Sequence, residues 1–257
     1  MKIAIAGYGK MGKMVHLLAK GMDNVEVTNI IDPAAGNAEV TDERVTADSI
    51  RDADAVIDFS SSQAVMENIR VYARCSATAV IGTTGWLDHL DEVKKLIGGT
   101  DARILYSGNF SLGVTLFLML VQEASRLISN IPSYDVAISE IHHSEKADSP
   151  SGTALMAAEK VLSRLERKNE ILTGNSEGKI RDNQLQITSM RVGHVPGVHA
   201  LTIDGPADTI TIQHSARNRE GFASGALQAA LWLMKQDKGL YSMDDFATSL
   251  TGGNADA

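Results

Sequence analysis

The chain lacks several features that would direct it to particular classes of protein. With a single cysteine, Cys75, among 257 residues it cannot form an internal disulfide, which suits a reducing compartment. Its net charge of −8 provides no basic surface for nucleic acid and no polybasic patch for a membrane. The most apolar run, Leu112 to Val121, is too short to span a bilayer. We therefore expect neither nucleic acid nor a membrane as a partner.

The N-terminus also lacks the pattern of a secretory signal, because Met1 to Ala6 has the β-rich composition of a strand. Together with the lone cysteine, this predicts a cytoplasmic protein. The composition, 44% hydrophobic and 22% charged, is ordinary for a soluble globular protein. The length allows one large domain or two smaller ones.

The same end of the chain carries a glycine motif in a specific setting. A strand at Lys2–Ala6 precedes Gly7-Tyr-Gly-Lys-Met-Gly12, a helical pattern follows, and a second strand at Val25–Ile31 ends at Asp32. Strand, G-x-G-x-x-G, helix and strand, with an acid about 20 residues further on, form a dinucleotide fingerprint. The motif predicts a bound dinucleotide, with Asp32 accepting hydrogen bonds from its ribose hydroxyls. The alternative is a turn of the same shape that binds no ligand.

Strands and helices continue to alternate up to about residue 110. Loops rich in Gly, Ser and Thr follow the strands, and in a doubly wound parallel sheet ligands bind at that edge. We therefore expect a Rossmann-type parallel sheet with a cofactor at the ends of its strands. The further strands are expected at 55–59, 78–81 and 103–106, the helices at 63–73 and 87–97, and the loops at 60–62, 82–85 and 107–110.

The pattern changes in the second half, where strands cluster without helices between them. The expected order is helix, strand, helix and then three strands, of which the last two form a hairpin across a Gly-Pro turn. The expected ranges are 111–128, 134–141, 153–165, 185–192, 199–204 and 209–214, with a polar surface excursion at 168–186 and a final helix at 221–234 that returns to the first domain. This predicts a dinucleotide-binding domain at 1–109 and 218–257. A second α+β domain with a mixed sheet, for substrate binding and oligomerisation, occupies 110–217.

The most chemically loaded stretch is Glu140-Ile-His-His-Ser-Glu-Lys-Ala-Asp-Ser-Pro-Ser-Gly-Thr153. It places His142, His143 and Lys146 just past a strand, on a loop that ends at a helix N-terminus. The first N–H groups of that helix, near Gly152 and Thr153, have no intrahelical acceptor and suit a carboxylate or phosphate. The alternative is a core histidine beside a solvated lysine. The set as a whole favours a site for an anionic substrate.

Other classes of function fit less well. A semialdehyde dehydrogenase needs a cysteine nucleophile in a site loop, and Cys75 lies late in a predicted helix or in the turn after it. A nucleotide-sensing regulator needs a DNA-binding or partner module for which the chain has neither basic charge nor spare length. Another small amino-acid dehydrogenase of similar plan stays open. A zinc site from Glu140, His142 and His143 is disfavoured because residues two and three apart at a strand end converge poorly. We expect no metal.

These motifs together resemble the 4-hydroxy-tetrahydrodipicolinate reductase family, formerly called dihydrodipicolinate reductases. The resemblance rests on the early G-x-G-x-x-G, the central G-T-T-G, E-x-H-H-x-x-K-x-D-x-P-S-G-T-A, and a late arginine before a Gly-Phe-Ala helix. It runs over nearly the whole chain. It implies an NADH- or NADPH-dependent oxidoreductase that reduces a cyclic dicarboxylate to tetrahydrodipicolinate in diaminopimelate and lysine biosynthesis. It also implies a homotetramer built through the second domain.

The resemblance also assigns roles to individual residues. His142 matches the family's proton donor and Lys146 its catalytic lysine. The matches to substrate-binding positions are His143, Gly152, Thr153 and, with looser spacing, Arg217. The matches to cofactor-binding positions are Gly7, Tyr8, Gly9, Lys10, Met11, Gly12, Asp32, Gly82, Thr83, Thr84, Ser107, Gly108, Asn109 and Phe110. The sequence assigns no role to Arg191 or His199.

The choice between NADH and NADPH rests on three residues. Asp32 opposes a 2′-phosphate, and the next residue, Pro33, stands where some family members carry an arginine. Lys10 acts the other way, as a flexible point charge without the bidentate geometry of a guanidinium. We expect use of both cofactors with a modest preference for NADH.

Overall fold

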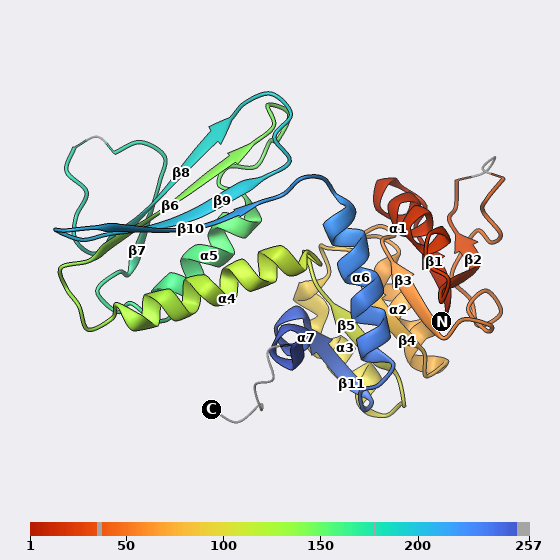
Figure 1. The fold of residues 1–257 in the computed structure, drawn as a ribbon. Coiled ribbons are helices and arrows are strands. Elements are labelled where there is room, and N and C mark those ends of the chain that lie inside the picture. The colour runs from red at the N-terminus through yellow and green to blue at the C-terminus, as the bar shows by residue number, and fades with distance from the viewer. Residues whose placement is uncertain (35–37, 177, 251–257) are drawn as a thin grey trace. The chain divides into compact units, whose positions relative to one another are not determined.

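The computed structural model describes residues 1–34, 38–176 and 178–250 (Figure 1). They form two compact units, one from the described residues of 1–112 and 220–250 and the other from those of 113–219. Each unit has its own sheet and its own buried apolar core. The two are therefore described separately.

The first unit is built on a six-stranded sheet in which every strand pair is parallel. The strand order is β11-β5-β4-β3-β1-β2, so the order reverses beside β1, and helices cover both faces over two separate apolar clusters. This confirms the predicted doubly wound sheet. The strands are β1 (Lys2–Ala6), β2 (Glu26–Ile31), β3 (Ala55–Asp58), β4 (Thr78–Ile81), β5 (Arg103–Tyr106) and β11 (Gly239–Ser242). The helices are α1 (Lys10–Lys20), α2 (Val65–Arg74), η1 (Leu87–His89), α3 (Leu90–Gly98), α6 (Glu220–Leu233) and α7 (Met243–Leu250).

Helix α6 returns the chain to the first unit, as predicted. It packs beside α1 and against β3, β4 and β5, and a side chain on Gly225 would collide with the backbone of Phe110 at 1.8 Å. The strand that follows, β11, pairs with β5 and was not predicted. Its four residues are too few to show a period of two, and only the sheet edge left open by β5 makes them a strand.

The second unit has a mixed sheet in the order β10-β9-β6-β8-β7, as predicted for this domain. Strand β6 lies at its centre, antiparallel to β9 and parallel to β8, and the β9–β10 hairpin is confirmed. The expected surface excursion was wrong in part, because it contains β7, which pairs with β8. The elements are α4 (Leu112–Leu127), β6 (Asp135–His142), α5 (Gly152–Leu162), β7 (Glu170–Thr173), β8 (Gln184–Arg191), β9 (Val198–Asp204) and β10 (Thr209–Ser215).

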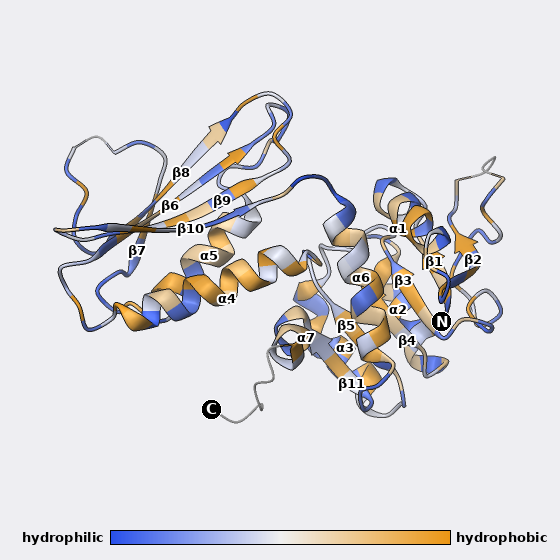
Figure 2. Ribbon diagram, viewed as in Figure 1, coloured by the Kyte–Doolittle hydropathy of each residue, from blue (hydrophilic) through white to orange (hydrophobic). Residues whose placement is uncertain are grey.

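Helix α4 is apolar along most of its length (Figure 2). One side packs into the core through Val114, Phe117 and Val121, whereas Leu116 and Leu120 are 47% and 56% exposed. Among the described residues, no helix combines the length and the apolarity needed to cross a lipid bilayer.

Candidate functional sites

The glycine loop between β1 and α1 has the geometry of a phosphate cradle. Gly7 has a φ of +87°, and a Cβ there would lie 2.3 Å from the carbonyl oxygen of Phe59. At Gly12 a Cβ would lie 1.9 Å from the carbonyl oxygen of Gly7, so only glycine lets α1 begin this close to the strand. At Gly9 a Cβ would meet nothing within 4 Å, so the backbone faces open space. Gly9 also precedes α1 without a side-chain cap, leaving first-turn N–H groups for an anion.

Asp32 stands at the end of β2, beside this loop. Its carboxylate accepts the N–H of Tyr8 at 2.6 Å and the N–H of Ala34 at 2.8 Å, which fix its orientation. It lines a pocket of about 410 Å³ together with Gly7, Gly9 and Ser60. The size and the carboxylate suit a nucleoside.

The same pocket contains a residue that the sequence reasoning missed, Arg44. The chain around Asp42 runs beside the end of β2, because the Asp32 N–H donates to the Asp42 carbonyl at 2.9 Å. This brings Arg44 to the pocket that Asp32 lines. The expectation that no guanidinium stands near the ribose-binding acid considered only Pro33 and did not include this loop.

The other predicted cofactor loops are held by internal contacts. The buried Asp58 at the end of β3 accepts the hydroxyl of Thr83 at 3.0 Å, and Trp86 donates to the Thr83 carbonyl at 2.8 Å. These contacts fix Thr83 in its loop. Together with Lys10, Met11, Gly82 and Thr84 it lines a second pocket of about 460 Å³. Phe110 is 1% exposed and packs edge-on against Phe59, so its side chain belongs to the core. Ser107 and Asn109 bond each other, as a turn does, and Gly108 lies between them.

In the second unit, the buried face of β6 changes from apolar to polar residues along the strand. Val136 and Ile138 face the core, and the next two residues on the same face are Glu140 and His142, which are 1% and 7% exposed. Side chains two apart on a strand point the same way, so the spacing E-x-H brings these two together. His143 follows the last residue of β6 and is half-buried.

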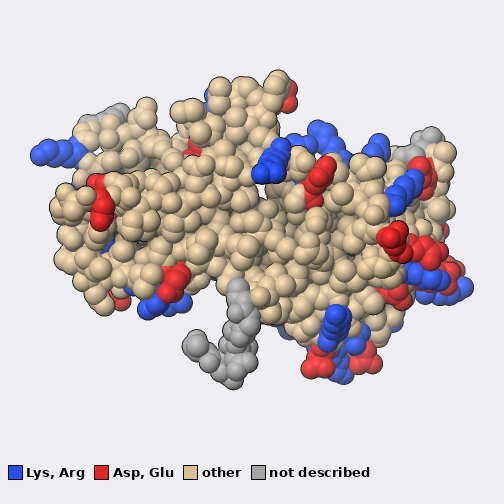
Figure 3. Space-filling model, in the orientation of Figure 1, with Lys and Arg blue, Asp and Glu red and all other residues tan. Residues whose placement is uncertain are grey.

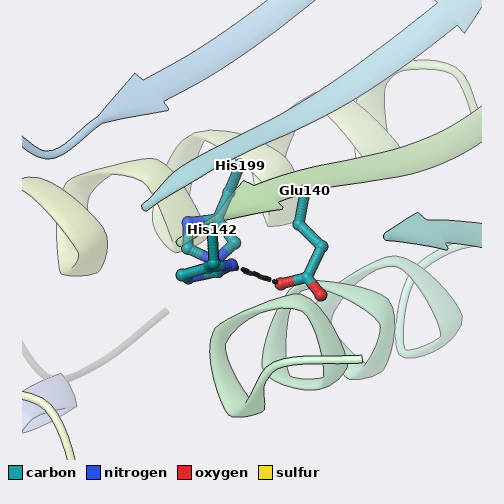
Figure 4. Close-up of side chains that lie close together, drawn as sticks. All are labelled: Glu140, His142 and His199. Carbon is teal, nitrogen blue, oxygen red and sulfur yellow. Dashed lines mark ion pairs between the residues drawn. The ribbon is translucent and has the colours of Figure 1, made fainter. Parts of the chain in front are cut away.

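Glu140 is the centre of this cluster (Figure 4). Its Oε1 accepts the Ser151 N–H at 3.1 Å and Nη2 of Arg191 at 2.9 Å, and its Oε2 lies 3.1 Å from Nδ1 of His142 and 3.8 Å from Nε2 of His199. Burial raises the pKa of Glu140, but hydrogen bonds from Ser151, Ser189 and Arg191 outweigh it and lower the pKa to about 2. Glu140 is therefore an anion at neutral pH.

His199 and Arg191, to which the sequence assigned no role, reach the cluster through sheet register. His199 on β9 stands opposite Glu140, and Arg191 on β8 stands beside His142. The His199 Nε2 contacts the Ser151 hydroxyl at 3.1 Å, and its ring lies edge-on to His142 at 5.0 Å between centroids. Burial lowers the pKa of His199 to about 4, so it is neutral at pH 7.

Lys146 is fixed by a residue of its own loop. Its Nζ donates to both carboxylate oxygens of Asp148, at 2.7 and 2.8 Å, and only 22% of its side chain is exposed. The loop is tied back to the strand because Nη2 of Arg191 also donates to the Asp148 carbonyl, at 2.7 Å. The structure thus places Lys146, as well as His142, within one connected network.

Helix α5 begins with a capped turn next to Glu140. The N-cap Ser151 accepts the N–H of Ala154 at 3.2 Å, and its own N–H goes to Glu140. Among the described residues the N–H of Gly152 has no acceptor, and a Cβ on Gly152 would meet nothing within 4 Å. Arg217 is exposed just after β10, and its neighbour Ala216 donates to the Gly197 carbonyl at 2.8 Å.

The cluster also has the donor types of a metal site, but with His199 in place of His143. Among the described residues, Glu140, His142 and His199 each offer a ligand atom, and these atoms lie within 4.8 Å of one another. The Arg191 guanidinium at 2.9 Å from Glu140 already balances the carboxylate and repels a second cation. The geometry therefore favours a proton network over a metal.

Comparison with known proteins agrees with both units. The family model described as dihydrodipicolinate reductase, N-terminus, matches residues 1–110, and the model for the C-terminus of the same enzyme matches residues 113–247. The chain belongs to the dihydrodipicolinate reductase family. This confirms the resemblance drawn from the motifs and makes the chain an NAD(P)H-dependent oxidoreductase.

Two relatives are similar to this chain over nearly its whole length. The 4-hydroxy-tetrahydrodipicolinate reductase of Christiangramia forsetii is 34% identical over 250 residues, covering 97% of this chain and 99% of the relative. The enzyme of the same name from Rickettsia bellii is 35% identical, with 97% and 96% covered. A solved structure of dipicolinate-bound dihydrodipicolinate reductase from Paenisporosarcina sp. TG-14 has the same fold, with a TM-score of 0.78 at 23% identity over 95% of this chain and 98% of that one.

Proposed function

We propose that the chain catalyses the NAD(P)H-dependent reduction of 4-hydroxy-tetrahydrodipicolinate to tetrahydrodipicolinate, with the 4-hydroxyl group leaving as water, in diaminopimelate and lysine biosynthesis. The observation that carries the proposal is the full-length match to reductases of this name, since it spans both the nucleotide-binding unit and the unit with the His142 cluster. Glu140, His142 and Lys146 of the E-x-H-H-x-x-K stretch join one network of hydrogen bonds and ion pairs with Asp148 and Arg191, which supports a shared reaction.

The first unit fits the cofactor. Gly9 leaves open space above the uncapped start of α1 for the pyrophosphate, and Asp32 stands where a ribose hydroxyl can donate to it. When bound, the reduced nicotinamide supplies the hydride. Gly82 and Thr84, which line the second pocket with Lys10, extend the binding surface beyond the glycine loop.

The second unit fits a cyclic dicarboxylate. The Gly152 N–H, helped by the dipole of α5, donates a hydrogen bond to one carboxylate, with Lys146, His143, Thr153 and Arg217 supplying further contacts. His142, on the same network, donates the proton that completes the reduction at a ring carbon. Lys146 adds positive charge that attracts the substrate carboxylates. Because the protein is acidic overall, this charge must be supplied locally in the site.

The proposal includes a homotetramer in the cytoplasm that needs no metal. The half-exposed leucines of α4 support an oligomer, and on the face in Figure 3 charged side chains are sparse over residues 113–219. Light scattering on the purified chain tests the assembly, and an assay with and without a chelator tests the metal.

The decisive experiment follows the loss of NAD(P)H absorbance while a separate synthase makes the substrate from pyruvate and aspartate semialdehyde. Oxidation that depends on both precursors is the expected result. A matched reaction with meso-diaminopimelate and the oxidised cofactor tests the amino-acid dehydrogenase alternative. Activity in that reaction alone would overturn the proposal.

A further inference from the structure

Two buried polar atoms in the His142 cluster stand close together without another partner. The Oε2 of Glu140 and the Nδ1 of His142 are each buried and without an aligned hydrogen bond, yet they lie 3.1 Å apart. Burying an unpaired polar atom is costly, so a small rotation that joins the two is strongly favoured. The Oε2 of Glu140 and the Nδ1 of His142 can therefore form a hydrogen bond with each other.

The other ring nitrogen of His142 lies against a residue with no side chain. A Cβ on Gly197 would stand 3.1 Å from Nε2 of His142, and Gly197 has a φ of +155°. The glycine keeps this side of the imidazole clear. His142 is therefore polarised by its surroundings, with a carboxylate at Nδ1 and space at Nε2.

Glu140 is suited to act on His142 because other residues already stabilise its negative charge. Its Oε1 is taken by Arg191 and the Ser151 N–H, which leaves Oε2 for the histidine. The neighbouring His199 does not compete as a cation, because it is neutral at pH 7 and its Nε2 contacts the Ser151 hydroxyl.

We propose that Glu140 is the positioning residue for His142, accepting its Nδ1–H, directing Nε2 to the open side, and stabilising the imidazolium that delivers the proton. The inference rests on the proposed function in that it takes His142 as the proton donor. Neither Glu140 nor Gly197 was assigned a role from the sequence. The pairing is one of position and charge, and Glu140 itself makes no contact with the reacting ring.

The charged groups around His142 set the direction of its pH dependence. Burial lowers its pKa, Lys146 and Arg191 lower it further, and Glu140 and Asp148 raise it. Glu140 is the closest of these at 3.1 Å. Removing its charge therefore lowers the pKa of His142, so the acid form is lost at a lower pH.

The first test is kinetic and uses Glu140→Gln. The falling limb of kcat against pH should move down by about one unit or more, which is the usual size of an opposite-charge effect. The affinity for NADH should stay within about twofold, because the cofactor residues lie in the other unit. Glu159→Gln, an exposed glutamate on α5, is the control and should leave the profile in place. A limb that does not move in a folded Glu140→Gln would overturn the proposal.

The second test measures the wild-type protein and is independent of activity and of whether Glu140→Gln folds. Nitrogen NMR of the chain labelled in its seven histidines, with His142→Gln to assign the signal, reports which ring nitrogen holds the proton in neutral His142. The proposal requires the Nδ1–H form, whereas free imidazole side chains favour Nε2–H. Finding Nε2–H on neutral His142 would overturn it. A failure of the reductase assay would instead overturn the proposed function and leave this measurement intact.

Discussion

Both carboxylate oxygens of Asp148 accept hydrogen bonds from Nζ of Lys146, at 2.7 and 2.8 Å. The two residues lie two positions apart on one loop. Because Arg191 holds the backbone of the same aspartate, the lysine is oriented from β8 as well as from its own loop. The motif K-x-D is thus one unit in which the acid positions the cation.

Replacing Asp148 by Asn should therefore lower kcat/KM for the substrate by about tenfold, since a misplaced binding group loses much of its effect. The loss should appear mainly in KM, because Lys146 would still be charged. Steady-state kinetics at saturating cofactor measure it. Glu145→Gln removes a neighbouring exposed charge and is the matched control. An equal loss of kcat/KM in both variants would mean that the negative charge of the loop matters, and not the contact between Asp148 and Lys146.

His142→Ala should lower kcat by ~10²–10⁴-fold, the usual contribution of a positioned acid, while cofactor affinity stays near that of the wild type. Turnover and NADH fluorescence titration measure the two effects separately. His194→Ala, on an exposed loop residue, should behave like the wild type. Full turnover in His142→Ala would remove this residue from the reaction.

Gly152→Pro should weaken inhibition by pyridine-2,6-dicarboxylate by about tenfold or more, because it removes the N–H at the start of α5. The helix should tolerate it, since proline suits the first helical position and Ser151 has the extended ψ of 155° that a following proline requires. Gly152→Ala keeps the N–H and places its Cβ in open space, so it is the control. Competitive inhibition measurements on both variants decide it. Equal affinities would exclude this N–H from the site.

Arg44→Ala should reduce the ratio of kcat/KM for NADPH to that for NADH by about fivefold, because a single guanidinium–phosphate contact at a partly exposed site is worth about a kcal/mol. Arg44 lines the pocket of Asp32, so it counters the repulsion that the carboxylate exerts on a 2′-phosphate. Measuring both cofactors with both proteins gives the ratio, and Arg51→Ala is the control. An unchanged ratio would mean that the 2′-phosphate does not reach this loop.

The protein should become less stable as the pH is lowered, over a range set by the pKa of His199. Its folded pKa is about 4, below the ordinary 6.5, so below pH 6.5 the unfolded chain takes up a proton that the folded chain refuses. The stability is complete above pH 6.5 and is lost as the pH falls to about 4, by about 3 kcal/mol at most. Glu140, with a pKa of about 2 against an ordinary 4.5, adds a loss at lower pH.

Urea unfolding at a series of pH values measures this slope. In His199→Gln the slope between pH 6.5 and 4 should flatten, whatever the absolute stability of the variant. His89→Gln, at a histidine 57% exposed, should keep the wild-type slope. An unchanged slope in His199→Gln would assign the acid sensitivity to other groups.

The sequence by itself determined the local devices of this protein. The glycine spacing from Gly7 to Gly12 predicted the first turn, in which Gly7 has a positive φ and Gly12 lies against the Gly7 carbonyl. The alternation along β6 placed Val136 and Ile138 on the core face, and the same period of two carries Glu140 and His142. The doubly wound sheet followed from the alternation of strands and helices, and the family from its motifs.

Only the tertiary structure decided which distant residues complete the two sites. Arg191 reaches Glu140 across 51 residues, and His199 arrives on β9 with Gly197 just before that strand, because strand register sets neighbours that no spacing in the chain encodes. Arg44 enters the pocket of Asp32 because the loop around Asp42 runs beside β2. Strand β11 exists because β5 offers an open edge to four residues that show no pattern alone. Local periodicity fixes which face a side chain takes, and the folded sheet fixes what that face meets.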